Sequence, residues 1–453
     1  MFCHTPRSQN VYWQRRSILP IISKKGTAGC RLVIGMKQLL VRPSGALRGS
    51  VQIGGSKNAA LPILAAVLLS EDACVISNLP AIRDVELTLQ ILLHMGCTVE
   101  WIDRATCKID ARHASPSTTP DPLTGRLRAS SYFLGAGLGR FGEGRIGRIG
   151  GCDFGTRPID QHIKAFRALG ATVACTDGEV FVCAKGPLQG ARIVFDTVSV
   201  GATVNAMLAA VRAQGETVLC RVAKEPHVVD LALFLNRLGA DIRGAGTDEI
   251  RIKGVRRLGG ARHVIIPDMI EAGTYLLAGA ATRGAVRVCG IQPKDLAPLT
   301  RSLRAMGADV DEEEKAISVF APAVLRGTCV ETGPHPAFPT DLQPQMTALL
   351  TTAEGVSVVR ETVWQNRFRY VDELQKMQAA ITKRENALLI LGGHLLGADM
   401  TVPDLRAGAA LLIAACAAEG ESILREAHWI ERGYENLLGK MQSLGADITA
   451  QEA

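Results

Sequence analysis

One short phrase recurs six times along the chain at nearly constant spacing. Two well-preserved copies are Arg237-Leu-Gly-Ala-Asp-Ile and Ser443-Leu-Gly-Ala-Asp-Ile. The residues at the centre of the six copies are Gly96, Gly170, Gly239, Gly307, Gln378 and Gly445, which are 67 to 74 residues apart. Self-similarity at a fixed period is the signature of a repeated structural unit. We therefore predict six copies of one supersecondary motif.

A second marker recurs at the same spacing. It is an apolar helical stretch of small residues that ends in a turn. It occupies residues 61–70, 130–144, 202–215, 272–284, 342–355 and 407–420. Each unit is predicted to run strand, apolar helix, strand, amphipathic helix, strand, strand. In the third copy these segments are 192–196, 201–213, 217–222, 228–238, 241–243 and 249–253. A helix that is apolar all round must be buried on every side, so three copies should share one core walled by sheets.

Six copies then make two domains of α/β class, which is also what 453 residues favour. The sixth copy ends one strand short, whereas residues 38–42 form a strand-like segment before the first copy. We expect this N-terminal strand to complete the last copy. Domain one is predicted to span 57–265, and domain two is predicted to be discontinuous, with 36–56 and 266–453. Residues 1–35 form a separate basic extension.

A net charge of +7 could indicate nucleic-acid binding, but the position of the charge along the chain argues against it. Residues 1–35 hold six basic side chains and no acid, so the rest of the chain is almost neutral and binding of nucleic acid is not expected. Met36 is a candidate start because the patterned sequence begins there, and a transit-like extension is the alternative.

The cysteines and the apolar runs indicate the compartment. The twelve cysteines include no CxxC pair, which favours a reducing, cytoplasmic location over a disulfide framework. The longest apolar run, residues 407–418, is shorter than the eighteen or so residues that suggest a membrane span, so membrane insertion is not expected. The histidines lack HxH or HExxH spacing, and we assign no metal.

The segment 150–162 is predicted to be an active-site loop. Its glycines frame Cys152, and Arg157-Pro158 opens an amphipathic helix five residues later. A helix N-terminus and an arginine favour a thiolate and a bound phosphate or carboxylate. The alternative is a buried structural cysteine. His162, one turn into the helix, is interpreted first as a structural histidine and second as a substrate contact.

When the repeats are aligned, polar residues collect at two positions, both between a strand and a helix. The start of the apolar helix carries Lys57, Asn58, Arg128, Ser199, Val200, Gly201, Asp341 and Arg406. The loop before the amphipathic helix carries Cys152, Arg157, Glu225, Arg367 and Arg432. In α/β folds such positions lie at the carboxyl ends of strands, where ligands bind. Six cations in these positions predict a site for a phosphate-bearing substrate.

Several longer phrases resemble those of the enolpyruvyl transferases, in particular the branch that uses UDP-N-acetylglucosamine. They are Gly55-Ser-Lys-Asn-Ala-Ala-Leu-Pro62, Gly150-Gly-Cys152, Arg157-Pro158, Val198-Ser-Val-Gly-Ala-Thr203, His335-Pro-Ala-Phe-Pro-Thr-Asp341, Asn366-Arg-Phe368, Asp404-Leu-Arg406 and Arg432-Gly-Tyr434. The resemblance runs from about Met36 to the end. It implies a two-domain inside-out α/β barrel built from six repeats. The relatives that act on shikimate phosphate lack the cysteine loop.

The resemblance also implies a reaction, in which the enolpyruvyl group of phosphoenolpyruvate moves to the sugar 3-hydroxyl of UDP-N-acetylglucosamine as the first committed step of peptidoglycan synthesis. No cofactor is implied. Cys152 would be the acid and Asp341 the base, and a fosfomycin-type inhibitor would react with Cys152. Phosphoenolpyruvate would lie against Lys57, Asn58, Arg157 and Arg432, with Arg406 nearby. Arg367 is a further predicted substrate-binding residue. The UDP-sugar would lie against Arg128, Arg157, Pro158, Ile159, Asp160, Gln161, Val198, Ser199, Val200, Gly201, Asp341 and the carbonyl of Val363.

Two residues depart from the family pattern. Thr197 stands where relatives often have a lysine that contacts the nucleotide, and Trp364 stands where phenylalanine is usual. Two alternatives to the implied function also remain open. One is an enolpyruvyl transferase for another phosphorylated acceptor, and the other is a non-catalytic paralogue that binds the UDP-sugar and regulates wall synthesis.

Overall fold

The computed structural model describes residues 37–116, 127–147, 159–176 and 179–452, which lie in one compact unit, Met36–Ala453. Apolar and amphipathic helices alternate along the chain. The apolar helices are α1 (Lys57–Ala66), α4 (Tyr132–Phe141), α6 (Val200–Ala210), α8 (Met269–Ala281), α10 (Gln343–Leu350) and α12 (Leu405–Ala417). The amphipathic helices are α2 (Arg83–His94), α5 (Asp160–Ala168), α7 (Pro226–Arg237), α9 (Ala297–Ala305), α11 (Val371–Lys376) and α13 (Leu437–Ser443). This alternation confirms the sixfold repeat.

The described strands form six separate sheets, so the helices are walled by individual sheets and not by one closed barrel. Three sheets have the orders β13 (Arg262–Val264), β3 (Cys74–Ser77), β5 (Cys107–Asp110), β4 (Thr98–Trp101); β6 (Glu143–Ile146), β8 (Glu179–Cys183), β7 (Thr172–Thr176); and β11 (Asp241–Arg243), β12 (Glu249–Lys253), β10 (Glu216–Cys220), β9 (Arg192–Val194). The others are β15 (Asp309–Glu313), β16 (Ala316–Phe320), β14 (Ala285–Cys289), β2 (Arg48–Gln52); β17 (Cys329–Glu331), β18 (Val356–Arg360), β20 (Ala387–Leu391), β19 (Ala380–Arg384); and β21 (Asp399–Thr401), β22 (Ser422–Arg425), β1 (Lys37–Val41), β23 (Ile448–Glu452).

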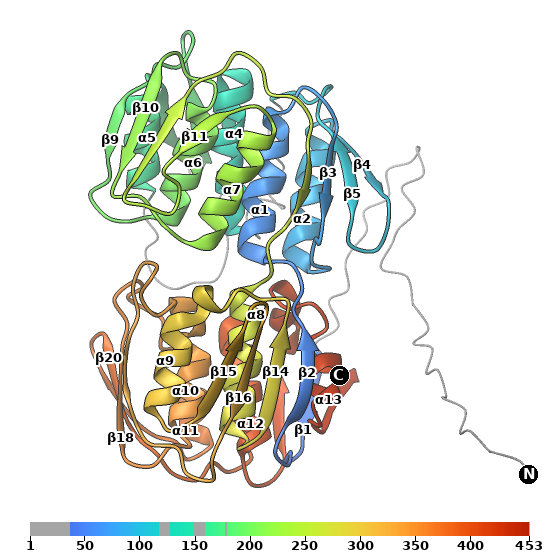
Figure 1. The fold of residues 1–453 in the computed structure, drawn as a ribbon, viewed down its shortest axis with the longest axis vertical. Helices are drawn as coiled ribbons and strands as arrows, with labels where there is room; N and C mark the ends of the chain where they lie inside the picture. The colour runs from blue at the N-terminus through green and yellow to red at the C-terminus, as the bar shows by residue number, and fades with distance from the viewer. Residues whose placement is uncertain (1–36, 117–126, 148–158, 177–178, 453) are drawn as a thin grey trace, which may run out of the picture. The chain divides into compact units, whose positions relative to one another are not determined.

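The N-terminal strand β1 completes the last copy, as predicted. It pairs antiparallel with both β22 and β23, for example Leu39 with Leu424 and with Ala450. In Figure 1 the blue strands β1 and β2 accordingly lie among yellow and red elements from later parts of the chain. The strand β2 pairs in parallel with β14 of the fourth copy, and β13, which follows the third copy, returns to pair with β3 of the first.

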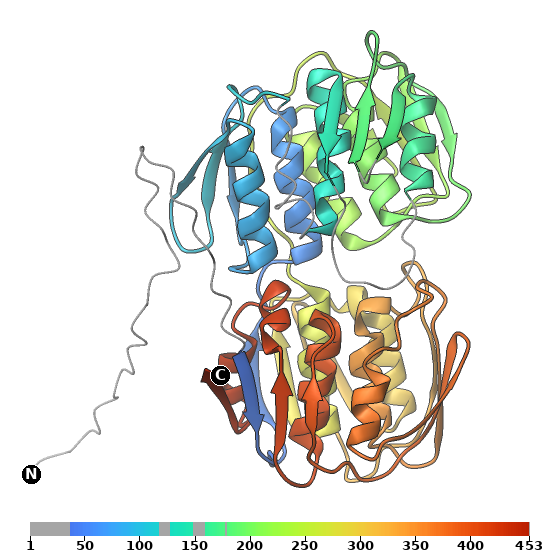
Figure 2. The ribbon, with the colours of Figure 1, turned by 180° about the vertical axis from the view of Figure 1, so that it is seen from behind.

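Buried apolar side chains of the described residues form two clusters. The members of one cluster lie between residues 59 and 265. The members of the other lie within residues 39–53 and 270–448. The apolar helices supply the middle of each cluster; in α8, for example, every residue after Met269 is buried. Figure 2 shows the same arrangement from the opposite side. Small side chains allow these helices to approach one another closely. The close packing then covers the helices on all sides.

The central residue of the recurring phrase has a defined structural task. Gly96, Gly170, Gly239, Gly307 and Gly445 all have positive φ angles, from +91° to +105°, just after a helix ends. Glycine adopts this left-handed conformation without the steric cost that other residues carry. In the degraded fifth copy Gln378 takes the same conformation, with φ of +66°. The period seen in the sequence is therefore the period of the turn that ends each amphipathic helix.

The third copy shows how closely the expected element boundaries match. The strands β11 and β12 lie where predicted, whereas α7 begins at Pro226, two residues earlier than expected. Glu225 precedes it in an extended conformation, and a proline is well suited to the first turn because its missing N–H needs no partner there. The helix α6 ends at Ala210 because a tight turn and the bridge at Gln214 follow.

The chain crosses between the two clusters at two segments that lie against each other. Gly55 forms an antiparallel bridge with Pro267, and the Ser56 N–H donates to the Ile266 carbonyl at 2.7 Å. Asp268 caps α8 and also accepts a 3.1 Å hydrogen bond from the backbone N–H of Lys57. A Cβ at position 55 would lie 1.7 Å from the Asn78 carbonyl oxygen, so only glycine fits. The first residue of α1 is therefore fixed by this crossing.

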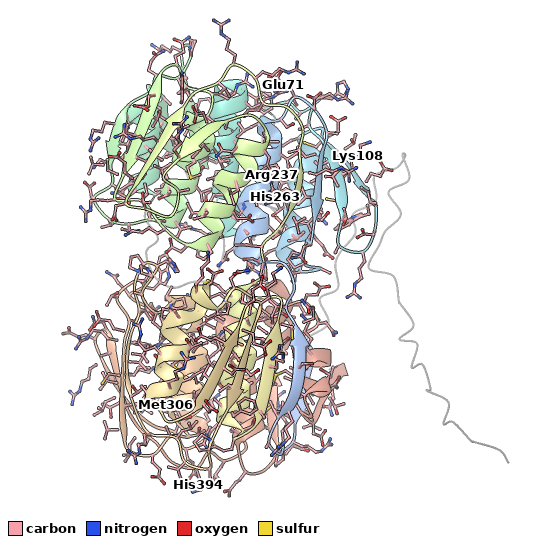
Figure 3. The ribbon with its side chains drawn as sticks, viewed as in Figure 1. Glu71, Lys108, Arg237, His263, Met306 and His394 are labelled. Atoms are coloured by element: carbon pink, nitrogen blue, oxygen red, sulfur yellow. The ribbon has the colours of Figure 1, made fainter. Side chains whose placement is uncertain are left out.

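A buried polar group anchors the returning segment. Figure 3 shows Arg237 and His263 close together, from α7 and β13. His263 Nδ1 lies 2.7 Å from Arg237 Nη1, and His263 Nε2 lies 3.0 Å from Asp230 Oδ1. Arginine can only donate, so Nδ1 accepts and the Nε2–H donates to Asp230. Asp230 also accepts from the Ile266 N–H at 3.3 Å, which ties the crossing segment to α7.

Candidate active site

Four of the described site residues lie at or just before the starts of helices, as the repeat alignment predicted. Lys57 is the first residue of α1, and Arg406 is the second residue of α12, two residues after the capping Asp404. Asp341 lies in a 3₁₀ turn (Thr340–Leu342) directly before α10, and Arg128 begins another (Arg128–Ser131) before α4. Because helix N-termini carry partial positive charge, these positions suit an anionic ligand.

Lys57 and Arg432 share one carboxylate. Lys57 Nζ lies 2.7 Å from Asp84 Oδ2, and Arg432 Nε lies 2.9 Å from Asp84 Oδ1. Asp84 is 1% exposed, in the first turn of α2, and the Arg432 guanidinium also lies 5.4 Å from the ring centre of Trp429. Burial would raise the pKa of Asp84, but Lys57 and Arg432 outweigh this effect and hold the pKa below its usual value. Asp84 therefore stays ionised between two cations.

Sequence reasoning missed Asp84. The residue lies at the start of the first amphipathic helix, which is the same repeat position that holds Glu225 before α7 and Arg432 near the end of the chain. Listing the residue at that position in the first copy would have found it. The pairing itself was not visible, because 348 residues separate Asp84 from Arg432.

Asp341 forms the second group. Its Oδ1 accepts from Arg367 Nη2 at 2.9 Å, and its Oδ2 accepts from Arg406 Nη2 at 3.0 Å. Burial would raise the pKa of Asp341, but the charges of Arg406 and Arg367 hold the pKa far below its usual value. In this state the carboxylate is a weak base. Arg406 is 3% exposed, and its Nη1 has no hydrogen-bond partner among the described residues.

Glu361 is a second residue that sequence reasoning missed. Its Oε1 accepts from the Thr332 hydroxyl and from the backbone N–H groups of Val363 and Trp364, at 2.9, 2.8 and 3.1 Å. Its Oε2 accepts from the Thr340 hydroxyl at 2.9 Å. Glu361 is buried and thus joins the turn that carries Asp341 to the loop that carries Val363. No pattern in the sequence marks it.

The helix α5 and the start of α6 bring further predicted residues together. Gln161 binds Asp196 through both its amide N–H and its carbonyl oxygen, at 3.1 and 2.9 Å. His162 Nδ1 lies 3.0 Å from the Asn205 amide, and a Cβ at Gly201 would lie 2.9 Å from the His162 ring. Burial, with the nearby Arg128, lowers the pKa of His162 to about 4, so the imidazole is neutral. These contacts fit the structural interpretation of His162.

The remaining predicted residues differ in what the structure says of them. Val198 and Val363 are exposed, and Ser199 caps α6 by accepting from the Ala202 N–H at 3.3 Å. Asn58, Ile159 and Val200 are half-buried and Asp160 is exposed, at the starts of α1, α5 and α6. Cys152, Arg157 and Pro158 lie outside the described residues. Within the part that is described, no group of three acidic, histidine or cysteine side chains is placed to hold a metal ion, and no helix has the length and apolarity to cross a membrane.

Comparison with known proteins identifies the class that this fold and site define. The family model for EPSP synthase (3-phosphoshikimate 1-carboxyvinyltransferase) matches residues 41–441. The solved enolpyruvyl transferase NikO from Streptomyces tendae is 28% identical, with a TM-score of 0.84 over 92% of this chain and 100% of that chain. An EPSP synthase from Acinetobacter baumannii shares the fold, with a TM-score of 0.71 and 19% identity over 92% of this chain and all of its own. The chain belongs to this enolpyruvyl transferase family.

Two curated relatives narrow the resemblance within the family. UDP-N-acetylglucosamine 1-carboxyvinyltransferase 3 of Caldanaerobacter subterraneus subsp. tengcongensis is 47% identical over 91% of this chain and 99% of its own length. UDP-N-acetylglucosamine 1-carboxyvinyltransferase of Finegoldia magna is 45% identical over 91% of this chain and 98% of its own length.

Proposed function

We propose that the protein transfers the enolpyruvyl group of phosphoenolpyruvate to the 3-hydroxyl of UDP-N-acetylglucosamine and releases phosphate, in the cytoplasm, as the first committed step of peptidoglycan synthesis. The observation that carries the proposal is the arrangement of four buried cations in two pairs. Lys57 and Arg432 surround one carboxylate, and Arg367 and Arg406 surround another. A substrate with a phosphate and a carboxylate matches such pairs. The curated relatives and the free described cysteines support the acceptor and the compartment.

The chemistry requires one acid and one base on opposite partners. As the sugar hydroxyl oxygen bonds to C2 of phosphoenolpyruvate, Asp341 takes the hydroxyl proton and Cys152 gives a proton to the C3 methylene. The tetrahedral intermediate then loses phosphate, while the Cys152 thiolate takes back one C3 proton, which restores the double bond. Lys57 and Arg432 stabilise the negative charge on the phosphate, while Arg128, Gln161 and the start of α6 hold the UDP-sugar.

Asp341 acts as a base only after its arginines change partners. While Arg367 and Arg406 bind it, the pKa of Asp341 is too low for efficient proton abstraction. An anionic group of phosphoenolpyruvate competes for the same guanidinium groups, and its arrival frees the carboxylate. Base activation is thereby coupled to binding of the donor.

One assay separates this function from its alternatives. Phosphate release from phosphoenolpyruvate is measured with UDP-N-acetylglucosamine, with shikimate 3-phosphate, and with neither. Release with the UDP-sugar alone is expected. Release with shikimate 3-phosphate would favour another acceptor, and UDP-sugar binding without any release would favour a non-catalytic regulatory paralogue.

The two hydrophobic clusters support two domains, 57–265 and 36–56 with 266–453, joined at Gly55 and Pro267. We expect them to close on the UDP-sugar, since the site cations come from both. Small-angle scattering should show a smaller radius of gyration with the UDP-sugar than without it. An unchanged radius would count against closure.

Thr197 predicts weak nucleotide binding. An ammonium in place of its hydroxyl adds one charge-assisted contact to a nucleotide phosphate, which is typically worth about 1–2 kcal/mol. Thr197 is exposed, just before α6, so a longer side chain fits. Thr197→Lys should lower the Michaelis constant for the UDP-sugar roughly tenfold and leave turnover nearly unchanged. A constant that stays the same would mean that another residue supplies the charge.

A further inference from the structure

The buried face of Arg406 lies on an aromatic ring that the proposed chemistry does not use. The guanidinium carbon of Arg406 lies 5.2 Å from the ring centre of Tyr434. Tyr434 is 3% exposed and follows the turn that carries Arg432. A guanidinium over the face of a desolvated ring is attracted by the ring quadrupole. The ring thus supports the guanidinium of Arg406, which is almost completely buried.

The hydroxyl of Tyr434 fixes the ring itself. It lies 3.1 Å from Thr274 Oγ1 and 3.0 Å from Gln345 Nε2, and Gln345 Nε2 also donates to Thr274 at 3.2 Å. The Thr274 hydroxyl donates to the Ile270 carbonyl at 2.7 Å, which uses its only hydrogen. The phenol hydrogen therefore points at Thr274, and the phenol oxygen accepts from Gln345. These bonds hold the Tyr434 hydroxyl in place between α8 and α10.

The network joins the three apolar helices that share this cluster. Thr274 belongs to α8, Gln345 to α10 and Arg406 to α12. Gln345 is fully buried, and its Oε1 has no hydrogen-bond partner among the described residues. An unsatisfied buried amide oxygen is destabilising, and an apolar side chain would avoid that loss. A role of its Nε2 in holding Tyr434 explains why a glutamine fits this position.

We propose that Tyr434 is a positioning residue for Arg406: its hydroxyl, held by Thr274 and Gln345, keeps the ring under the guanidinium and aims that group at the anionic donor substrate. The inference rests on the proposed function in that it takes phosphoenolpyruvate as the ligand of Arg406. Tyr434 itself touches no reacting atom. Its removal should weaken the donor and leave the acceptor alone.

Tyr434→Phe keeps the ring and removes only the hydroxyl. We expect affinity for phosphoenolpyruvate, measured by titration calorimetry without the UDP-sugar so that no turnover occurs, to fall about 10- to 100-fold, the size of effect that a small misplacement of a binding group produces. The Michaelis constant for phosphoenolpyruvate should rise by the same factor, and that for the UDP-sugar should not move. Tyr370→Phe is the matched control, since Tyr370 is a buried tyrosine whose hydroxyl also binds a glutamine and a threonine, Gln343 and Thr347.

A double-mutant cycle separates positioning from simple loss of packing. Once Arg406→Lys has replaced the guanidinium, adding Tyr434→Phe should weaken donor binding no further, whereas Tyr370→Phe should act equally in both backgrounds. Independent effects of Tyr434→Phe and Arg406→Lys would overturn the proposal, as would a loss of donor affinity no larger than that of Tyr370→Phe. Calorimetry gives this answer even if the wild type releases no phosphate, a result that would contradict the proposed reaction alone.

Discussion

Replacing Cys152 by alanine should lower turnover by about 10²- to 10⁴-fold, the usual contribution of a general acid. Cys152 follows two glycines and precedes Arg157 by five residues. An arginine and the start of a helix favour the thiolate, which makes the side chain reactive as well as acidic. The same variant should therefore lose covalent labelling by fosfomycin, an electrophilic epoxide, and steady-state rates with peptide mass mapping measure both effects.

Cys152→Asp is the informative companion to this variant. A carboxylic acid can deliver a proton to the C3 methylene but is a much poorer nucleophile toward an epoxide, so turnover should return without labelling. The UDP-sugar should speed labelling of the wild type. Cys329, which is exposed, serves as a reference thiol. An adduct on any other of the twelve cysteines, or full activity in Cys152→Ala, would remove the loop from its proposed role.

Asp84→Asn should destabilise the fold by about 3–5 kcal/mol, because it leaves two buried cations without their shared counter-charge. Lys57 and Arg432 both lie close to this carboxylate, at 2.7 and 2.9 Å. The free energy of unfolding is measured by denaturant titration. Turnover should fall as well, since both cations belong to the proposed phosphate site.

The difference in stability between the wild type and Asp84→Asn should depend on pH, and the direction follows from the pKa of Asp84. The folded-state pKa of Asp84 lies below its usual value, so the unfolded chain binds the proton more readily. The stability contributed by Asp84 is therefore fully present above about pH 4 and is lost as the pH falls through the lower folded pKa. Wild type and Asp84→Asn should differ most near neutral pH and converge in strong acid.

An exposed ion pair provides the control. Asp399 binds Arg425 at 2.6 and 2.8 Å, yet about half of each side chain is exposed. Asp399→Asn should change stability by at most about 1 kcal/mol, as is usual for surface pairs. If Asp84→Asn is no more harmful than Asp399→Asn, the buried carboxylate does not hold the two cations in solution.

The repeat and its helix ends could be predicted because they depend on local rules. Gly170 and Gly239 mark turns that need a positive φ angle, and a turn of this kind is written into a few neighbouring residues. The apolar stretch around α6 could likewise be assigned to a core, because no solvated helix is apolar all round. The helix starts at Lys57, Asp341 and Arg406 could also be predicted locally, because the order of neighbouring residues marks where a helix begins.

The sequence by itself thus determined the sixfold unit, the helix starts that carry charge, and the missing strand that β1 supplies. Only the tertiary structure decided which charges meet. Asp84 and Arg432 are 348 residues apart, and Asp341 and Arg406 are 65 apart, so no local pattern couples them. Tyr434 and Gln345 likewise meet only through tertiary packing, because 89 residues separate them. A carboxylate between two cations depends on distances of about 3 Å, which packing sets and residue order does not.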